Sequence, residues 1–267
     1  MPMADATLNR YVERSRPGGV SPHPGGVSPP DSSMSLSEGG LPTHVVLKLA
    51  EQAAAGLSHM HKQDVVHNDI HTGNLVLYGA RSTDTQHLQV KWADFGRACW
   101  AKECGNLNFR PSELFNLSFR PPELLFGGGA HIIAKGVGPH GHSRWHYVNG
   151  SGRARNSTAS DVWAFGCILM YITKAYTPFR PLDTFQDEVV QQIVSMVNVL
   201  GRPRPEIIRS LGWSQMFDNF VVPVKSTGRC DWPSLAVVNE GMVQMLVFDP
   251  KQRLSAAQVH EKLRTAS

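Results

Sequence analysis

The chain has 267 residues, enough for one sizeable globular domain or two small ones. Lys and Arg total 26 against 22 Asp and Glu, and the resulting net charge of +4 is too small to indicate a nucleic-acid partner. The longest apolar run, at 162–172, falls short of the ~20 residues that span a membrane, so we expect a buried helix and no membrane contact.

Cysteine usage indicates a reducing compartment. The four cysteines, at 99, 104, 167 and 230, show no C-x-x-C spacing, and the polar, Pro-rich N-terminus carries no secretory signal. Disulfides are rare in reducing compartments. We therefore expect reduced thiols and an intracellular protein, cytoplasmic or nuclear.

The N-terminal segment differs in composition from the rest of the chain. Residues 6–15 predict a short amphipathic helix, with apolar residues on one face. These residues are Leu8, Tyr11 and Val12. The hexapeptide Pro-Gly-Gly-Val-Ser-Pro occurs twice between residues 17 and 29, which predicts disorder. We therefore divide the chain into a segment at 1–40, with a helix and a disordered stretch, and a domain at 41–267.

A long helix and a hairpin begin that domain. Residues 43–62 predict the helix, because apolar residues recur at spacings of three and four. These residues are Val46, Leu49, Ala50, Ala53, Leu57 and Met60. Residues 75–78 and 88–92 predict two strands of one hairpin. Such a hairpin would place Asn74 and Asp94 at neighbouring strand ends.

The second half of the domain is predicted to be mainly helical. We expect mostly loop between residues 96 and 161, including a Gly-, His- and Ser-rich insertion at about 127–159, and another loop-rich stretch at 201–233. Helices are predicted at 162–173, about 184–200, about 237–247 and after a capping box at 255–258. About six helices and one small hairpin predict an α+β fold that is predominantly α.

Three oxygen-bearing side chains surround the predicted hairpin. Asp69 and Asn74 lie five residues apart on one loop, and Asp94 follows the second strand. Phosphoryl transfer requires a carboxylate to orient a hydroxyl, and an amide and a second carboxylate to hold Mg²⁺ on the phosphates. The sequence therefore predicts phosphoryl transfer.

These residues and their neighbours resemble the C-terminal lobe of a eukaryotic protein kinase. The matched motifs are the catalytic loop (His67-Asn68-Asp69 with Asn74), the metal-binding motif (Asp94-Phe95-Gly96) and the end of the activation segment (Pro122-Glu123). Further matches lie at 160–166, 200–203 and 249–255. The segment at 119–127 is most similar to the cyclin-dependent and related proline-directed Ser/Thr kinases.

The resemblance implies roles at the site. Asp69 would orient the substrate hydroxyl, while Asn74 and Asp94 would coordinate Mg²⁺ on the phosphates of ATP. Val76 and Ala93 would line the floor under the adenine. The implied reaction is the phosphorylation of Ser or Thr in a protein substrate.

Other matched residues would support the site. Glu123 would pair with Arg253 in a partly buried ion pair that anchors the activation segment. Asp161 would bond to the backbone of the catalytic loop, which begins at His67. The alternative role for Asp161 is an ordinary helix N-cap.

The chain also departs from the family pattern. No Gly-rich phosphate loop, third-strand Lys or partner Glu precedes residue 5, so we expect the N-terminal lobe to be absent and nucleotide binding to be very weak. Asn68 replaces the Arg that usually binds a phosphorylated activation loop. His71 replaces a catalytic-loop Lys, and an imidazole with a pKa of ~6.5 carries only part of a charge at neutral pH.

Two other functions remain open. The first is a non-catalytic pseudokinase or fragment that binds proteins, including a regulatory partner. The second is a small-molecule phosphotransferase of the aminoglycoside or choline kinase type, which the pattern His-x-Asp-x-His-x-Gly-Asn at 67–74 also resembles. In those enzymes the metal-binding Asp is usually not followed by Phe-Gly, and the pair matched by Glu123 and Arg253 is missing.

Overall fold

A computed structural model describes the arrangement of most of the chain. The described residues are 3–15, 41–82, 85–104, 115–127, 129–137, 143–148, 156–179, 187–217 and 236–265. The Pro/Gly repeat and its expected disorder lie outside these residues. Within them, no helix is both long enough and apolar enough to cross a bilayer.

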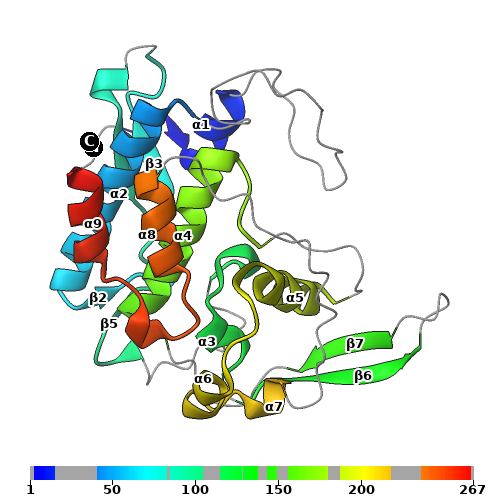
Figure 1. The fold of residues 1–267 in the computed structure, drawn as a ribbon. Helices are drawn as coiled ribbons and strands as arrows, with labels where there is room; N and C mark the ends of the chain where they lie inside the picture. Colours follow the sequence, from blue (N-terminus) through cyan, green and yellow to red (C-terminus); the bar gives the residue numbers. More distant parts are fainter. Residues whose placement is uncertain are drawn as a thin grey trace.

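Helices form the body of the molecule. In Figure 1, α2 (Thr43–Lys62), α4 (Thr158–Lys174), α8 (Ala236–Met245) and α9 (Ala256–Arg264) lie together, and α4 contacts both α2 and α8. The apolar stripe expected on α2 is buried. α4 is buried on nearly every side, as its continuous apolar sequence predicts, and Trp163 at its centre is fully buried. The mainly helical prediction is confirmed.

The start of α4 differs from the expectation. The helix begins at Thr158, one turn before the predicted start, because Ser157 and Ser160 form a capping box. Asp161 therefore lies inside the helix, and the N-cap role considered for it is wrong. Ala175 ends the helix in the left-handed conformation, with φ of 61°.

The predicted hairpin is present, but it belongs to a larger sheet. β3 (Leu75–Tyr78) pairs antiparallel with β4 (Gln89–Trp92), and β1 (Ala6–Thr7) pairs with the other edge of β3. β1 occupies two residues that were expected to be helical. The helix α1 (Leu8–Arg14) follows, with the predicted face turned toward the core. Asp5 fixes this N-terminal unit, because its carboxylate accepts a hydrogen bond from the N–H of Gly79.

The stretch expected to be loop contains further structure. β5 (Cys99–Trp100) pairs with β2 (Val65–Val66), and a longer hairpin is formed by β6 (His131–Val137) and β7 (Ser143–Val148). Two short helical elements precede that hairpin, η4 (Leu117–Phe119) and α3 (Pro122–Leu125). The loop prediction was wrong because Gly and His obscure the β-forming residues. Figure 1 shows β6 and β7 extending away from the helical body.

Helices also occupy part of the region after α4. α5 (Glu188–Leu200) starts later than predicted, and the Asp187 carboxylate caps it by accepting from two backbone N–H groups. The same carboxylate accepts the N–H of Tyr147 and contacts His146 at 3.0 Å, both on β7. Three short elements are α6 (Pro205–Ser210), α7 (Ser214–Phe217) and η5 (Pro250–Gln252). The loop prediction for 201–233 was therefore wrong at α6 and α7.

The contact between α4 and α8 yields a test. A Cβ added at Gly166 would lie 3.0 Å from Leu246 Cδ2 and 3.2 Å from Met245 Cβ, whereas one at Gly241 would meet only Met245 Cε at 3.8 Å. Gly166→Ala should therefore lose about 1–3 kcal/mol of unfolding free energy relative to Gly241→Ala, because overpacking offsets the helix-propensity gain that both share. Urea unfolding of both variants measures this difference. Equal free energies of unfolding would contradict the prediction, because they would show that α4 and α8 accommodate the added methyl group without cost.

Candidate active site

The catalytic loop lies between β2 and β3 and is joined to the segment after β4 through His67. This side chain is fully buried, and its Nε2 lies 3.0 Å from the carbonyl oxygen of Ala93. Its Nδ1 accepts the N–H of Asp69 at 3.3 Å, so the Nε2 nitrogen carries the proton donated to Ala93. The ring also lies 5.0 Å from the ring of Phe95. The loop and the Asp-Phe-Gly segment are therefore in direct contact.

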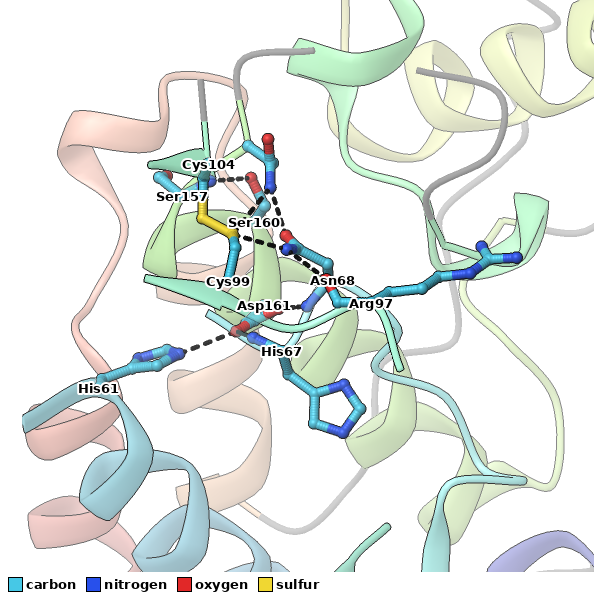
Figure 2. Close-up of a disulfide and its surroundings, with 10 residues drawn as sticks. His61, His67, Asn68, Arg97, Cys99, Cys104, Ser157, Ser160 and Asp161 are labelled. Atoms are coloured by element: carbon cyan, nitrogen blue, oxygen red, sulfur yellow. Dashed lines mark hydrogen bonds and ion pairs between the residues drawn. A yellow bond between two sulfur atoms is a disulfide. The ribbon is translucent and has the colours of Figure 1, made fainter. Parts of the chain in front are cut away.

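Asp161 supports this loop from α4. Its buried carboxylate accepts the backbone N–H of His67 at 2.8 Å and that of Asn68 at 3.0 Å. His61 Nε2, from the end of α2, lies 3.0 Å from the same carboxylate. Figure 2 shows His61 and the loop approaching Asp161 from different directions. The bond between Asp161 and the loop backbone is thus present, as expected.

The geometry of the loop brings Asn74 back to Asp69. Asn74 is 8 % exposed, and its Nδ2 donates to the carbonyl oxygen of Asp69 at 2.9 Å. That bond fixes the amide orientation and directs the donor side inward, which leaves Oδ1 as the atom suited to a cation. The Asp69 side chain is 18 % exposed.

Asp94 reaches the same place through the strand register. Leu75 pairs with Trp92. The next residues along the two strands, Asn74 and Ala93, are also joined, because the N–H of Ala93 donates to the Asn74 carbonyl at 2.9 Å. Asp94 is therefore the first residue after the one that faces Asn74. Its backbone is left-handed, with φ of 59°, and its exposed carboxylate accepts the N–H of Gly96 at 3.2 Å.

Val76 and Ala93, the residues expected under the adenine, are both partly exposed. Val76 lies on the face of β3 opposite the buried Leu75 and Leu77. Their place near Asn74 is set by the β3–β4 register, and their role in binding remains a prediction.

His71 lies close to both carboxylates. Its Nδ1 accepts the N–H of Gly73 at 3.0 Å, and its Nε2 is 3.9 Å from Asp69 Oδ1. Burial lowers the pKa of His71, although the negative charges of Asp69 and Asp94 partly oppose this effect. Both carboxylates act on one imidazole, so they lie on the same side of the molecule.

The oxygen donors fit Mg²⁺ when phosphates supply the other ligands. Asn74 and Asp94 offer an amide and a carboxylate oxygen, which Mg²⁺ prefers. Among the described residues, no group of three His, Cys, Asp or Glu side chains could hold a metal. Mg²⁺ usually retains water or phosphate ligands rather than occupying an all-protein cage. The donor set is therefore appropriate to nucleotide-bound Mg²⁺.

Glu123 and Arg253 form a buried ion pair. Arg253 donates from Nη1 to Glu123 Oε1 at 2.8 Å and from Nη2 to Oε2 at 2.6 Å. Its Nε donates to the carbonyl of Val247, and its guanidinium lies over the ring of Trp163. Ser160 donates to the same Glu123 carboxylate at 2.8 Å. The expected pair is present and connects α3 to α4 and to the segment before α9.

The expectation of reduced thiols was wrong for two cysteines. Cys99 and Cys104 form a disulfide with a Cα–Cα distance of 5.6 Å, while Cys167 is a buried thiol outside any disulfide. Sequence spacing did not reveal the bond, because it depends on the turn that follows β5. Asn68 was likewise treated only as a missing Arg, but its side chain contacts Cys99 Sγ at 3.0 Å (Figure 2).

Comparison with known proteins assigns this arrangement to a family. A family model for the protein kinase domain matches residues 31–263, which cover most of the chain. The chain belongs to the protein kinase family. Domains of this family generally use ATP and Mg²⁺.

Individual kinases are similar to this chain at modest identity. Mitogen-activated protein kinase 10 from Arabidopsis thaliana is 26 % identical over 76 % of this chain and 42 % of its own length. Cyclin-dependent kinase 14 from Mus musculus is 26 % identical over 84 % of this chain and 40 % of its own length. The chain thus spans less than half the length of these relatives. The match confirms the resemblance to cyclin-dependent and related kinases.

The assignment to the protein kinase family weakens the small-molecule alternative. Aminoglycoside- and choline-type phosphotransferases lack the pair that Glu123 and Arg253 form here. The chain is therefore a protein kinase homologue.

The kinase ion pair gives a stability prediction. Arg253→Ala should destabilise the fold by about 3–5 kcal/mol, because it leaves the Glu123 carboxylate buried and unpaired. This corresponds to a fall of roughly 10 °C in Tm. Arg264→Ala, which breaks an exposed pair with Glu261, is the matched control and should leave Tm nearly unchanged. Calorimetry on both variants measures the contrast, and similar small shifts would contradict an anchoring role.

The lowered pKa of His71 predicts a pH effect. The unfolded chain binds a proton at this residue more readily than the folded kinase homologue does. The resulting stability is fully present above about pH 6.5 and is lost as the pH falls toward the lowered pKa. Wild-type Tm should therefore fall more steeply than that of His71→Gln between about pH 7.5 and 5.5. His44→Gln, at an exposed position on α2, should follow the wild type. Parallel curves for all three proteins would refute the prediction.

Proposed function

We propose that this chain carries the chemical centre of a protein Ser/Thr kinase, which transfers the γ-phosphoryl group of ATP to a protein hydroxyl. The observation that carries the proposal is the convergence of Asp69, Asn74 and Asp94. The proposal is supported by the hydrogen bond from Asn74 to the Asp69 carbonyl and by the β3–β4 register, in which Ala93 faces Asn74 and Asp94 is the next residue along the chain. One carboxylate, one amide and a second carboxylate are the groups that this reaction requires.

Each residue has a distinct role in the proposed reaction. Asp69 accepts a hydrogen bond from the substrate Ser or Thr hydroxyl and orients its oxygen toward the phosphorus. Asn74 Oδ1 and the Asp94 carboxylate would hold Mg²⁺. The cation, when bound, neutralises phosphate charge and fixes the phosphate geometry. Val76 and Ala93 provide an apolar surface under the adenine.

His71 and Asn68 define how this site would differ from that of a strong kinase. Burial lowers the pKa of His71, which makes this side chain a weaker source of positive charge for the γ-phosphate than the Lys it replaces. Asn68 bonds internally to the Arg97 carbonyl instead of offering a guanidinium to a phosphorylated activation segment. We propose that residues 41–267 correspond to the C-terminal lobe of a kinase domain.

The second candidate is a non-catalytic binding module. The observation that favours it is the lowered pKa of His71, which stands where a Ser/Thr kinase has a Lys facing the γ-phosphate. In this function the kinase-like surface would bind a protein substrate or regulatory partner without chemistry. In either case we propose an intracellular protein, cytoplasmic or nuclear.

A nucleotide-binding experiment tests the proposal. A tenfold excess of ATP·Mg²⁺ over Kd should raise the unfolding free energy by about 1.4 kcal/mol, which is a Tm increase of a few degrees. Asp94→Asn should abolish the increase. Asp64→Asn is a matched control, because Asp64 is also left-handed, with φ of 57°, but is exposed on the turn between α2 and β2. Thermal shift with and without Mg²⁺ measures these effects.

The outcomes separate the two functions. A shift that needs Mg²⁺ and disappears only in Asp94→Asn supports the kinase proposal, and Asp69→Asn should then retain the shift but lose phosphorylation of a Ser/Thr peptide. A flat response in the wild type would exclude ATP·Mg²⁺ binding by these residues and leave the binding module.

A further inference from the structure

The disulfide lies directly behind the catalytic loop. In the β2–β5 pair, Cys99 stands opposite Val66, the residue that precedes His67. The chain then turns back, and the N–H of Ala101 donates to the Asp64 carbonyl at 2.7 Å. This turn brings Cys104 to Cys99. The cross-link thus joins two residues of the segment that follows the Asp-Phe-Gly motif.

Asn68 connects that cross-link to the catalytic machinery. Its Nδ2 donates to Cys99 Sγ at 3.0 Å and to the Arg97 carbonyl at 2.9 Å, while its Oδ1 accepts from Asn156. In Figure 2, Asn68 lies between the disulfide and Asp161, whereas the Arg97 side chain points away. Any displacement of Cys99 Sγ therefore acts on the residue directly before Asp69.

The backbone of Asn68 makes it sensitive to these contacts. It is fully buried and left-handed, with φ of 65°. Such a conformation is uncommon outside Gly and persists where surrounding contacts determine it. Here hydrogen bonds fix both parts of Asn68: its side chain is bonded as described above, and its backbone N–H donates to the Asp161 carboxylate.

The disulfide is not needed to form its own turn. The backbone bonds from Ala101 to Asp64 and from Glu103 to Trp100 remain available without it. The bridge spans a sequence separation of five, and a short loop gains less global stability from a cross-link than a long one does. Its principal effect is therefore local, on the position of Cys99 Sγ and on the Asn68 contacts.

We propose that Cys99 and Cys104 form a thiol–disulfide switch that sets the order of the catalytic loop through Asn68. The disulfide state holds Cys99 Sγ as a fixed acceptor and keeps the Asn68–Asp69 segment ordered. The dithiol state frees the Cys99 side chain and loosens this segment. The regulatory meaning of the switch rests on the proposed kinase function, whereas the switch itself is a property of the nucleotide-free protein.

The switching chemistry is an exchange with a dithiol reductant. One thiolate of the reductant attacks Cys99 Sγ, because Cys99 is partly exposed whereas Cys104 is 1 % exposed. The Cys99–Cys104 bond breaks, and the Cys104 thiolate leaves and takes up a proton. The second thiolate of the reductant then attacks the reductant sulfur that is bonded to Cys99. The Cys99 thiolate leaves and is protonated. Two electrons pass to the protein as the dithiol becomes a disulfide. In reducing compartments, disulfides that form are usually of this transient, sensing kind.

Hydrogen exchange of the nucleotide-free protein tests the switch. Intact mass after thiol alkylation first establishes the disulfide in untreated protein and its loss with dithiothreitol. Reduction should then accelerate amide exchange in a peptide covering 66–70 about fivefold, the effect of one lost hydrogen bond. Peptides from α9 should be unchanged. Cys104→Ser, which removes the bond but retains the Cys99 thiol, should exchange as reduced wild type does, with or without dithiothreitol.

Each other outcome overturns the proposal. Equal amide exchange rates at 66–70 in both redox states would show that the disulfide does not affect the order of the catalytic loop. Equal acceleration of exchange in α9 would show that the disulfide stabilises the whole fold rather than the catalytic loop. A protein with free thiols before reduction would lack the switch. Because no nucleotide is present, these results are independent of whether ATP·Mg²⁺ binds.

Discussion

The buried carboxylate of Asp161 determines where the loop from His67 to Asn74 lies in this kinase homologue. A carboxylate without solvent is stable only when N–H groups replace water, and here two loop amides and the His61 ring do so. The loop is therefore fixed to α4, the most buried helix, and to the end of α2. The hydrogen bonds to Asp161 also position Asp69 and Asn74, because these residues follow His67 and Asn68 on the same short loop.

The local signals in the sequence predicted a large part of the fold. The apolar spacing in α2, the β3–β4 hairpin and the capping box of Ser255 and Gln258 all depend on residues near one another in the chain, and the structure contains them. The motifs identified the Glu123–Arg253 pair for a different reason, which is family resemblance. Periodicity alone would not have joined residues 130 positions apart.

The failures of prediction arise from non-local effects. β1 is a strand only because the edge of β3 is available to it, and β6 and β7 are strands despite Gly- and His-rich surroundings because they pair with each other. The Cys99–Cys104 bond depends on a turn held by Asp64, on the other side of the catalytic loop. From the sequence, Asn68 is recognisable only as a replacement for the Arg of the kinase pattern. Its hydrogen bonds to Arg97 and Cys99 depend on the three-dimensional structure.

Asp187 gives the molecule a mechanical connection of its own. One carboxylate both caps α5 and accepts the backbone N–H of Tyr147 on β7, so the first turn of the helix and the base of the outlying hairpin share a single anchor. Tyr147 adds a second attachment, because its hydroxyl donates to the carbonyl of Leu125 at the end of α3. Force applied at the tip of the hairpin would consequently be transmitted to α5 and to the helix that carries Glu123, which makes the hairpin a lever arm rather than an independent appendage.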